Sequence, residues 1–387
     1  MSVTAPQGFR AAGVAAGLKT TGNPDVAVVV NDGPDDAAAA VFTTNRFPAA
    51  PVQWSRQVLA DGRLRAVVLN SGGANACTGP EGFQDTHATA EHLAAELGLG
   101  AIDVAVASTG LIGVRLPMDK LTAGVSAAVE ELSDDGGDAA ARAIMTTDTV
   151  PKTTVQTRSG PGGGWTVGGM AKGAGMLAPS LATMLVVLTT DAVVDGETLQ
   201  AALETATGVS VERVDSDGCL STNDTVIALA NGASGTTPTA EELTEALTAA
   251  ATDLAMQLLA DAEGSTKDIA ITVRNAATVD DALTAGRACA RNNLLKTALF
   301  GNDPNWGRVL AAIGTTDAAF EADQVDVSIN GVTVCRGGSI GDPREGVDLT
   351  GRSVMIDIDL HAGEEIATIW TNDLSIAYVH ENSAYSS

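Results

Sequence analysis

A threonine at the start of a predicted buried strand is the residue of this sequence best suited to nucleophilic chemistry. Thr183 follows a small, Gly-rich, turn-prone segment, Lys172–Ala182, and opens a run of Met, Leu, Val and Thr. Apolar residues on both faces of this run predict a strand that is buried on both sides. A hydroxyl group directly after a loop suits a nucleophile, although the β-propensity of threonine explains the same pattern without any chemistry.

A threonine hydroxyl needs a base to take its proton, and no histidine lies near Thr183 in the sequence. One alternative base is the α-amine of the threonine itself, which is available only if Thr183 is a chain terminus. The pKa of an α-amine is roughly 7.7–8.0, which suits a base near neutral pH. The peptide bond Ala182–Thr183 would first have to break, by an N→O acyl shift of the hydroxyl followed by hydrolysis of the ester.

Two other features combine polar groups with tight turns. Ser108-Thr109-Gly110 follows a predicted strand at Asp103–Ala107, and from the residues alone it is a plain turn. Lys172 is flanked by small residues, and from the residues alone it is a solvated loop lysine. The Gly-rich loops 160–175 and 301–308 lack the GKS or GKT of a phosphate-binding loop, so nucleotide binding is not expected.

Composition excludes several functional classes. The 387-residue chain has a formal net charge of −26 and no basic footprint, so we expect no nucleic-acid partner. No apolar run reaches the roughly 18–20 residues of a membrane span, and the first residues do not form a secretory signal, so we expect a cytoplasmic protein without a membrane partner. The four cysteines and four histidines lack metal-ligand spacing, and we expect no metal and no cofactor.

Predicted strands and helices alternate along the first two thirds of the chain, and the part after about residue 270 is rich in strands. This succession indicates an α/β fold, or α+β with mixed sheets layered with helices. The predicted helices include 117–132, 196–207, a capped helix from Thr239 to about Asp261, and Asp280–Leu295. The predicted C-terminal strands are Val325–Ile329, Val354–Leu360, Ile366–Thr371 and Ser375–Val379.

Five separated motifs carry a resemblance that runs the length of the chain. They are KGAGMLAPSLATML around Thr183, STG at Ser108–Gly110, MTTDT at Met145–Thr149, GNDPNWGR at Gly301–Arg308 and the tail HENSAYSS. Together, in the order in which they occur along the chain, they resemble the ornithine acetyltransferase family, the glutamate N-acetyltransferases of arginine biosynthesis.

The resemblance implies an N-terminal-nucleophile-like fold with a smaller, strand-rich C-terminal lobe at about 270–387. It implies self-cleavage between Ala182 and Thr183 into an α fragment, 1–182, and a β fragment, 183–387, which usually assemble as an α2β2 heterotetramer. The implied reaction moves an acetyl group from N-acetylornithine to glutamate in a ping-pong cycle through acetyl-Thr183. Acetyl-CoA is a further potential substrate, because family members differ in using it as a donor.

The resemblance also implies roles for individual residues. Thr109 and Gly110 match the oxyanion-hole pair of the family, and Thr183 is the nucleophile with its own α-amine as base. Ser387 stands where the family usually has threonine, so the hydroxyl is kept and a methyl group is lost. The implied substrate contacts are Thr146, Lys172, Thr183, Glu263, Asn382 and Ser387.

Two alternatives stay open from the residues. An aminopeptidase or amidase of the same N-terminal-threonine type would use Thr183 identically but pass the acyl group to water. A binding or scaffold protein would keep the fold without activity, and would remain one intact chain.

Overall fold

The computed structural model describes residues 2–160, 163–176 and 184–384. Within these ranges the chain forms three β-sheets and divides into two compact units. The first unit comprises Met1–Ala174, Ser180–Glu212 and Leu220–Leu258, and the second comprises Gly175–Pro179, Arg213–Cys219 and Leu259–Ser387. Helices pack on sheets that mix parallel and antiparallel pairs, so the predicted class, α/β with mixed sheets layered with helices, is confirmed.

The first unit contains two sheets. One has the strand order β1-β2-β4-β5, with bounds Phe9–Val14, Val26–Asn31, Ala66–Asn70 and Val104–Ser108. The other has the order β3-β9-β8-β7-β6, with bounds Ala37–Phe42, Thr225–Ala230, Leu185–Thr190, Gly163–Lys172 and Lys152–Gly160. One hydrophobic cluster includes side chains from both sheets, among them Val28, Val67, Leu185 and Ile227.

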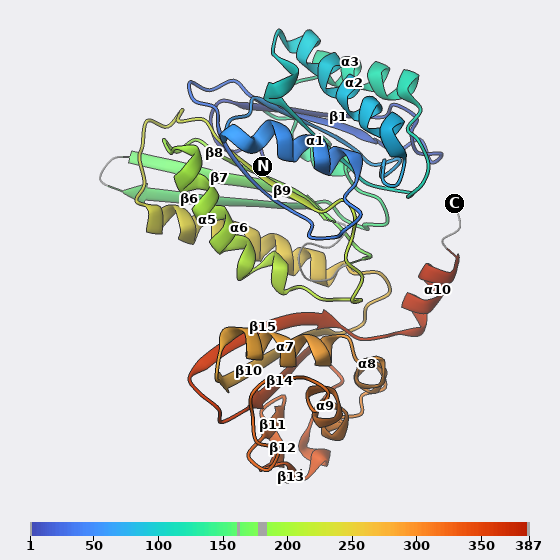
Figure 1. The fold of residues 1–387 in the computed structure, drawn as a ribbon, viewed down its shortest axis with the longest axis vertical. Helices are drawn as coiled ribbons and strands as arrows, with labels where there is room; N and C mark the ends of the chain where they lie inside the picture. The colour runs from blue at the N-terminus through green and yellow to red at the C-terminus, as the bar shows by residue number, and fades with distance from the viewer. Residues whose placement is uncertain (1, 161–162, 177–183, 385–387) are drawn as a thin grey trace. The chain divides into compact units, whose positions relative to one another are not determined.

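Helices cover these sheets in layers. Figure 1 shows α2 (Gly79–Leu97) and α3 (Met118–Glu130) on one side of the two sheets, and α5 (Gly196–Gly208) and α6 (Ala240–Ala260) on the other. α4 (Gly137–Ala143) contacts strands of both sheets. The helix predicted from Thr239 has its capping box: the Glu242 N–H donates to Thr239 Oγ1 (3.2 Å), and the Thr239 N–H donates to Glu242 Oε2 (2.8 Å).

α1 (Ala50–Val58) closes the free edge of β5 with side chains. Ser55 Oγ donates to the Val106 carbonyl oxygen (2.7 Å) and accepts from the Val106 N–H (2.9 Å). Trp54 Nε1 donates to the Val104 carbonyl oxygen (3.0 Å). These bonds satisfy backbone groups on the unpaired edge of β5, and β4 pairs with its other edge. The end of β5 is therefore held from both sides.

The strand predicted after Thr183 is β8, which lies between β9 and β7 in the middle of its sheet. All six residues of Leu185–Thr190 are buried, as predicted for a strand with apolar groups on both faces. Among the described residues it begins at Leu185, and Thr183 itself lies outside them.

The second unit is built on a sheet of order β13-β12-β11-β14-β10-β15. α7 (Val279–Ala290) packs on β10 and β15, and α9 (Trp306–Ile313) on β11, around a separate hydrophobic cluster. The strand bounds in this order are Ser339–Ile340, Val332–Arg336, Asp326–Ile329, Ser353–Asp359, Asp268–Ala276 and Glu365–Asn372. Short 3-10 helices lie at Leu59–Asp61, Ala101–Asp103, Val211–Arg213 and Arg344–Gly346.

Two predicted elements of this unit are wrong. The helix predicted at Asp280–Leu295 is divided into α7 and α8 (Asn293–Phe300), because the Asn292 side chain accepts from the Leu295 N–H (3.0 Å) and caps a new helix. The strand predicted at Ser375–Val379 is instead the start of α10 (Ile376–Ala384). There the Ser375 hydroxyl accepts from the Tyr378 N–H (2.9 Å), as an N-cap does.

Candidate active site

Thr109 lies directly beyond the carboxyl end of β5, beside the loop that follows the parallel strand β4. Asn70 is opposite Ser108 in the register of the two strands. The Thr109 N–H donates to the Asn70 carbonyl oxygen (2.9 Å), and the Gly73 N–H donates to the Thr109 carbonyl oxygen (3.1 Å). The Thr109 side chain is fully buried. The backbone N–H and carbonyl groups of Thr109 are therefore both fixed. They lie at the carboxyl ends of the strands, where α/β proteins commonly bind ligands.

Gly110 adopts a backbone conformation that a residue with a side chain would avoid. Its φ is +135°, and a Cβ atom built on it would lie 2.6 Å from Gly73 N and 2.9 Å from Gly73 Cα. Across the described residues, its N–H has no acceptor. Thr109 and Gly110 therefore offer a hydroxyl and an N–H from adjacent positions, as an oxyanion hole requires.

Lys172 is the last residue of β7, where it pairs with Leu185 of β8. Its side chain is only 2% exposed, so the alternative of a solvated loop lysine is wrong. Lys172 Nζ donates to Thr109 Oγ1 (3.3 Å) and lies 3.9 Å from Asp148 Oδ2. An ammonium that donates to the oxygen of a hydroxyl leaves its hydrogen free and makes it a stronger donor.

Asp148 joins Lys172 to the segment that contains Thr146. Its Oδ1 accepts from Lys152 Nζ (2.6 Å) and from the Gly173 N–H (2.7 Å), and its Oδ2 accepts from the Thr146 N–H (2.9 Å). Burial by itself raises the pKa of Asp148, but the ammonium groups of Lys172 and Lys152 outweigh it and lower the pKa to about 2. The carboxylate is therefore charged at neutral pH and holds both lysines in place.

The loop before β9 supplies two buried polar side chains. Asn223 Nδ2 donates to the carbonyl oxygens of Ala74 (2.6 Å) and Ser108 (2.8 Å), so it ties together the loops that follow β4 and β5. The adjacent Asp224 accepts at Oδ1 from the Met184 N–H (3.0 Å). This loop therefore connects the Thr109 turn to the residue that follows Thr183 in the chain.

Sequence reasoning missed Asp148, Asn223 and Asp224. Asp148 belongs to the MTTDT motif. Asn223 and Asp224 end a polar segment directly before a buried strand, and this position was the sequence signal that could have identified them. Their partners are distant in sequence, so only the folded chain shows which groups they bind.

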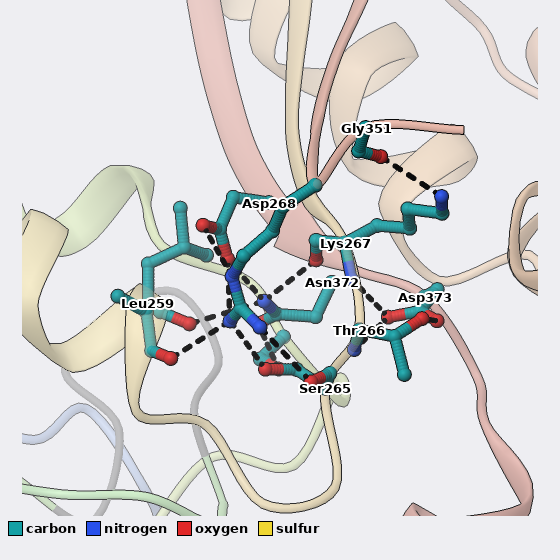
Figure 2. A network of polar contacts seen from close by, with 11 residues as sticks. Leu259, Ser265, Thr266, Lys267, Asp268, Gly351, Asn372 and Asp373 are labelled. Carbon is teal, nitrogen blue, oxygen red and sulfur yellow. Dashed lines mark hydrogen bonds and ion pairs between the residues drawn. The ribbon is translucent and has the colours of Figure 1, made fainter. Parts of the chain in front are cut away.

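Glu263 lies in the turn between α6 and β10 of the second unit, and its side chain is partly buried. Figure 2 shows the polar network that fastens the following residues: Asp373 Oδ1 accepts from the N–H groups of Thr266 and Lys267, at 2.8 Å each. Asn372 Nδ2 donates to the Lys267 carbonyl oxygen (3.0 Å). The turn that carries Glu263 is thus anchored to the end of β15.

The same turn is linked to α10, which carries Asn382. Ser375 Oγ donates to the Gly264 carbonyl oxygen, and Asn382 Nδ2 donates to the Tyr378 carbonyl oxygen (3.1 Å). Burial, with the carboxylates of Asp217 and Glu263, raises the pKa of Tyr378 to about 12. Gly264, which follows Glu263, packs against the backbone of this helix, because a Cβ atom built on it would lie 2.2 Å from the Tyr378 nitrogen.

The predicted site residues fall into three groups. Thr109 and Lys172 are in direct contact, with Gly110 and Thr146 next to them in the first unit. Glu263 and Asn382 are connected within the second unit. The remaining predicted residues, Ala182, Thr183 and Ser387, lie outside the described residues.

The motif Gly301–Arg308 is only partly a loop. It connects α8 to α9, and α9 begins within it at Trp306. Asp303 accepts at Oδ2 from Asn305 Nδ2 (2.9 Å), so the turn is internally bonded. No described contact gives it a chemical role.

A cavity of about 440 Å³ has a wall that includes Arg46, Phe47, Cys77 and Phe83, and none of the predicted site residues lines it. The described ranges hold no group of three or more His, Cys, Asp or Glu side chains arranged for a metal ion. Likewise, no described helix is both long and apolar enough to cross a membrane.

Comparison with known proteins identifies relatives along the whole chain. The model of the ArgJ family matches residues 10–387. The arginine biosynthesis bifunctional protein ArgJ of Streptomyces avermitilis is 66% identical over 387 residues, which is 100% of both chains. The protein of the same name from Mycobacterium tuberculosis is 59% identical over 394 residues, covering 100% of this chain and 96% of the relative.

Solved structures also match. An ornithine acetyltransferase of Mycobacterium tuberculosis, solved in complex with ornithine, is 66% identical over 47% of this chain and 96% of its own, with a TM-score of 0.45. The arginine biosynthesis bifunctional protein of Bacillus halodurans is 39% identical over 46% of this chain and 93% of its own, with a TM-score of 0.43.

Proposed function

The chain belongs to the ArgJ family, and from this membership we propose that it is an acyltransferase of arginine biosynthesis. It transfers the acetyl group of N2-acetyl-L-ornithine to L-glutamate and yields ornithine and N-acetylglutamate. Full-length relatives at 59–66% identity, named as arginine biosynthesis proteins, support this function. The observation that carries the chemistry is the contact between buried Lys172 and the Thr109 hydroxyl, next to the Gly110 N–H, which has no acceptor among the described residues.

The nucleophile in this proposal is Thr183, made available by self-cleavage. Its hydroxyl attacks the Ala182 carbonyl carbon, the peptide nitrogen leaves, and an ester links the two residues. Water hydrolyses the ester and gives fragments 1–182 and 183–387. The freed α-amine then serves as the base that the sequence otherwise lacks.

Acetyl transfer proceeds in two balanced steps. The Thr183 hydroxyl attacks the acetyl carbonyl of N-acetylornithine while its proton passes to the α-amine and then to the leaving nitrogen of ornithine. The α-amine of glutamate next attacks acetyl-Thr183, and the threonine oxygen regains a proton. Each step passes through an oxyanion, which the Thr109 hydroxyl and the Gly110 N–H bind in our proposal.

Lys172 has two functions in this proposal. Its contact with Thr109 polarises the oxyanion donor, and its charge also attracts the carboxylate of the substrate. Thr146 is a further substrate contact, held at its N–H by the same Asp148 carboxylate that faces Lys172.

Further residues take part in substrate recognition in this proposal. The Glu263 carboxylate binds the side-chain ammonium of the substrate, and Asn382 and Ser387 supply contacts from the C-terminal segment. The anchoring of the Glu263 turn to β15 and α10 supports a fixed position for that carboxylate.

Three further assignments accompany the proposal. Acetyl-CoA is a candidate second acetyl donor, with no resident cofactor. The two fragments assemble as an α2β2 heterotetramer, and the enzyme works in the cytoplasm, where free amino acids are made. Assay of N-acetylglutamate formation from acetyl-CoA, and the mass of the native assembly, test the first two.

An assay with N-acetylornithine labelled in the acetyl group tests the function. We expect the label to appear in N-acetylglutamate when glutamate is present. Label that appears only as free acetate would contradict the transferase and favour the aminopeptidase or amidase alternative, because water would then be the acceptor.

A further inference from the structure

Lys19 is a half-buried lysine beside the segment that carries Thr146. It lies in the loop between β1 and β2, and its Nζ donates to the carbonyl oxygens of Pro24 (2.8 Å) and Met145 (2.6 Å). Across the residues that the structure describes, it forms no ion pair and its third N–H has no acceptor. The chain has 48 acidic and 22 basic residues, so a half-buried ammonium without a paired carboxylate calls for a specific explanation.

The turn that carries Lys19 is fixed by Asp25, whose side chain is 0% exposed. Its Oδ1 accepts from the Ala16 N–H (2.7 Å), and its Oδ2 accepts from the N–H groups of Leu18 (2.6 Å) and Lys19 (2.9 Å). This carboxylate therefore holds the backbone of the turn. Lys19 is anchored at its backbone by Asp25 and at its ammonium by two carbonyl oxygens.

The same turn packs on the loop that binds Thr109. A Cβ atom built on Gly72 would lie 2.4 Å from Leu18 Cβ, so the turn is in direct contact with the loop that follows β4. The next residue of that loop, Gly73, donates its N–H to the Thr109 carbonyl oxygen (3.1 Å). The Lys19 turn therefore lies against the loop that fixes a proposed oxyanion donor.

The Lys19 ammonium also contacts the segment that contains a proposed substrate contact. Its acceptor Met145 directly precedes Thr146, whose N–H donates to Asp148 Oδ2 (2.9 Å). The same carboxylate oxygen lies 3.9 Å from Lys172 Nζ. Lys19 is thus bound one residue away from Thr146, in a segment that faces Lys172 through Asp148.

The charges around Lys19 favour an anion beside it. Burial lowers the pKa of its ammonium, Asp25 raises it, Lys172 lowers it and Asp148 raises it, and the net result is a lowered pKa. Asp148 already pairs with Lys152 and Lys172, so it does not fully balance a third ammonium. A carboxylate that binds to Lys19 would stabilise its charged form.

The proposed reaction needs a cation for glutamate that it does not need for ornithine. Both substrates carry an α-carboxylate, but the side chain of N-acetylornithine ends in an ammonium and that of glutamate in a carboxylate. In the proposed function Lys172 attracts the carboxylate that the substrates share, and Lys152 is 0% exposed and paired with Asp148. Of the three lysines in this network, Lys19 is the one with a donor for a second carboxylate.

We propose that Lys19 binds the side-chain carboxylate of glutamate and so helps to select the acetyl acceptor. This role rests on the proposed function, in which glutamate takes the acetyl group in the second half-reaction. The third N–H of Lys19 donates to the carboxylate, while the bonds to Pro24 and Met145 hold the ammonium in place. N-acetylornithine has no side-chain carboxylate, so it cannot form this charge-assisted hydrogen bond.

Lys19→Met and Lys120→Met form a matched pair of variants. Lys120 is exposed on α3, and its Nζ donates to the carbonyl oxygen of Gly17 in the same turn (2.9 Å). Lys120→Met therefore removes an ammonium that contacts this turn but does not bind Met145. It measures the general effect of losing a positive charge at the turn.

The experiment measures acetyl transfer from N-acetylornithine to glutamate, with each substrate varied in turn, in the wild-type protein and both variants. In a ping-pong cycle kcat/KM for glutamate reports the second half-reaction, and kcat/KM for N-acetylornithine reports the first. We expect Lys19→Met to lower kcat/KM for glutamate about 10-fold or more relative to that for N-acetylornithine, because a charge-assisted bond is lost. Lys120→Met should keep this ratio within about threefold of the wild-type value.

An unchanged ratio in Lys19→Met overturns the proposal, whether both values fall together, as a purely structural role predicts, or neither changes. If Lys19→Met does not fold or is not cleaved, Lys19→Gln takes its place, because an amide still donates to the Met145 carbonyl oxygen without a charge. The same ratio then decides. Failure of the proposed function is distinguishable, because the wild-type protein would then pass no acetyl group to glutamate.

Discussion

Gly110→Ala is the substitution that most directly tests the oxyanion hole. The new Cβ atom would lie 2.6 Å from Gly73 N and 2.9 Å from Gly73 Cα, both closer than ordinary carbon contacts allow. Gly73 cannot move freely, because its N–H binds the Thr109 carbonyl oxygen and its own carbonyl oxygen accepts from Asn70 (3.0 Å). The backbone at Gly110 must therefore shift, and its N–H with it.

Gly113→Ala provides the matched control in the same loop. Gly113 also has a positive φ, +82°, but a Cβ atom there meets nothing within 4 Å. Both substitutions place a side chain in an unfavourable φ region at about 1–2 kcal/mol. Only Gly110→Ala adds a steric clash, which typically costs a further 1–3 kcal/mol or so.

The expected effect on catalysis is larger than the difference in stability. Loss of one oxyanion donor typically lowers kcat about 100- to 1000-fold, which corresponds to about 2.7–4 kcal/mol of transition-state stabilisation. We therefore expect Gly110→Ala to lower kcat by that range while KM for N-acetylornithine changes little, and Gly113→Ala to keep kcat within about threefold of the wild-type value.

Steady-state kinetics of ornithine release, with circular dichroism to confirm folding, make this comparison. If a folded Gly110→Ala protein turned over as fast as Gly113→Ala, the N–H of Gly110 could not be an oxyanion donor. A rise in KM without a loss of kcat would also refute the reasoning, since the oxyanion exists only in the transition state.

Three further predictions concern other residues. Thr109→Ala should lower kcat more than it raises KM, and an unchanged kcat would exclude its hydroxyl from the oxyanion hole. Glu263→Gln should mainly weaken binding of N-acetylornithine, about 10-fold or more, because a charge-assisted bond is lost; an unchanged KM would contradict this role. The lowered pKa of Asp148, from 3.8 to about 2, contributes about 2 kcal/mol of stability above pH 4 that is lost as pH falls toward 2. Denaturant unfolding should show this loss in the wild-type protein and not in Asp148→Asn. This variant is also less stable at neutral pH, because the buried ion pair between Asp148 and Lys152 loses its carboxylate.

The elements that sequence predicted well are those whose signals are local. The run after Thr183 is apolar on both faces, so β8 was predictable without knowing its neighbours. Thr239 and Glu242 form a capping box, so the start of α6 was predictable too. By contrast, α10 was mistaken for a strand, because the bond from Ser375 to Gly264 that fixes its start joins distant parts of the chain.

The candidate site was also predictable only where its signals are local. Sequence motifs identified Thr109 and Lys172 as candidates, but only the fold shows that they are in contact and that Lys172 is buried. The sequence did not identify Asp148 and Asp224 as site residues. A carboxylate in a polar segment has the same sequence pattern whether it is solvated or buried against a lysine or a peptide N–H. Burial and long-range pairing are properties of the folded chain and were not readable from composition or spacing.

The central claim is that Thr183 becomes a chain terminus and carries the acetyl group. Intact mass spectrometry of the purified protein, before and after N-acetylornithine and then glutamate, tests it most directly. We expect two fragments, 1–182 and 183–387, with one acetyl group that appears on the second fragment and disappears with glutamate. A single 39.0 kDa chain that still transfers acetyl groups, or a second fragment that is never acetylated during turnover, would contradict it.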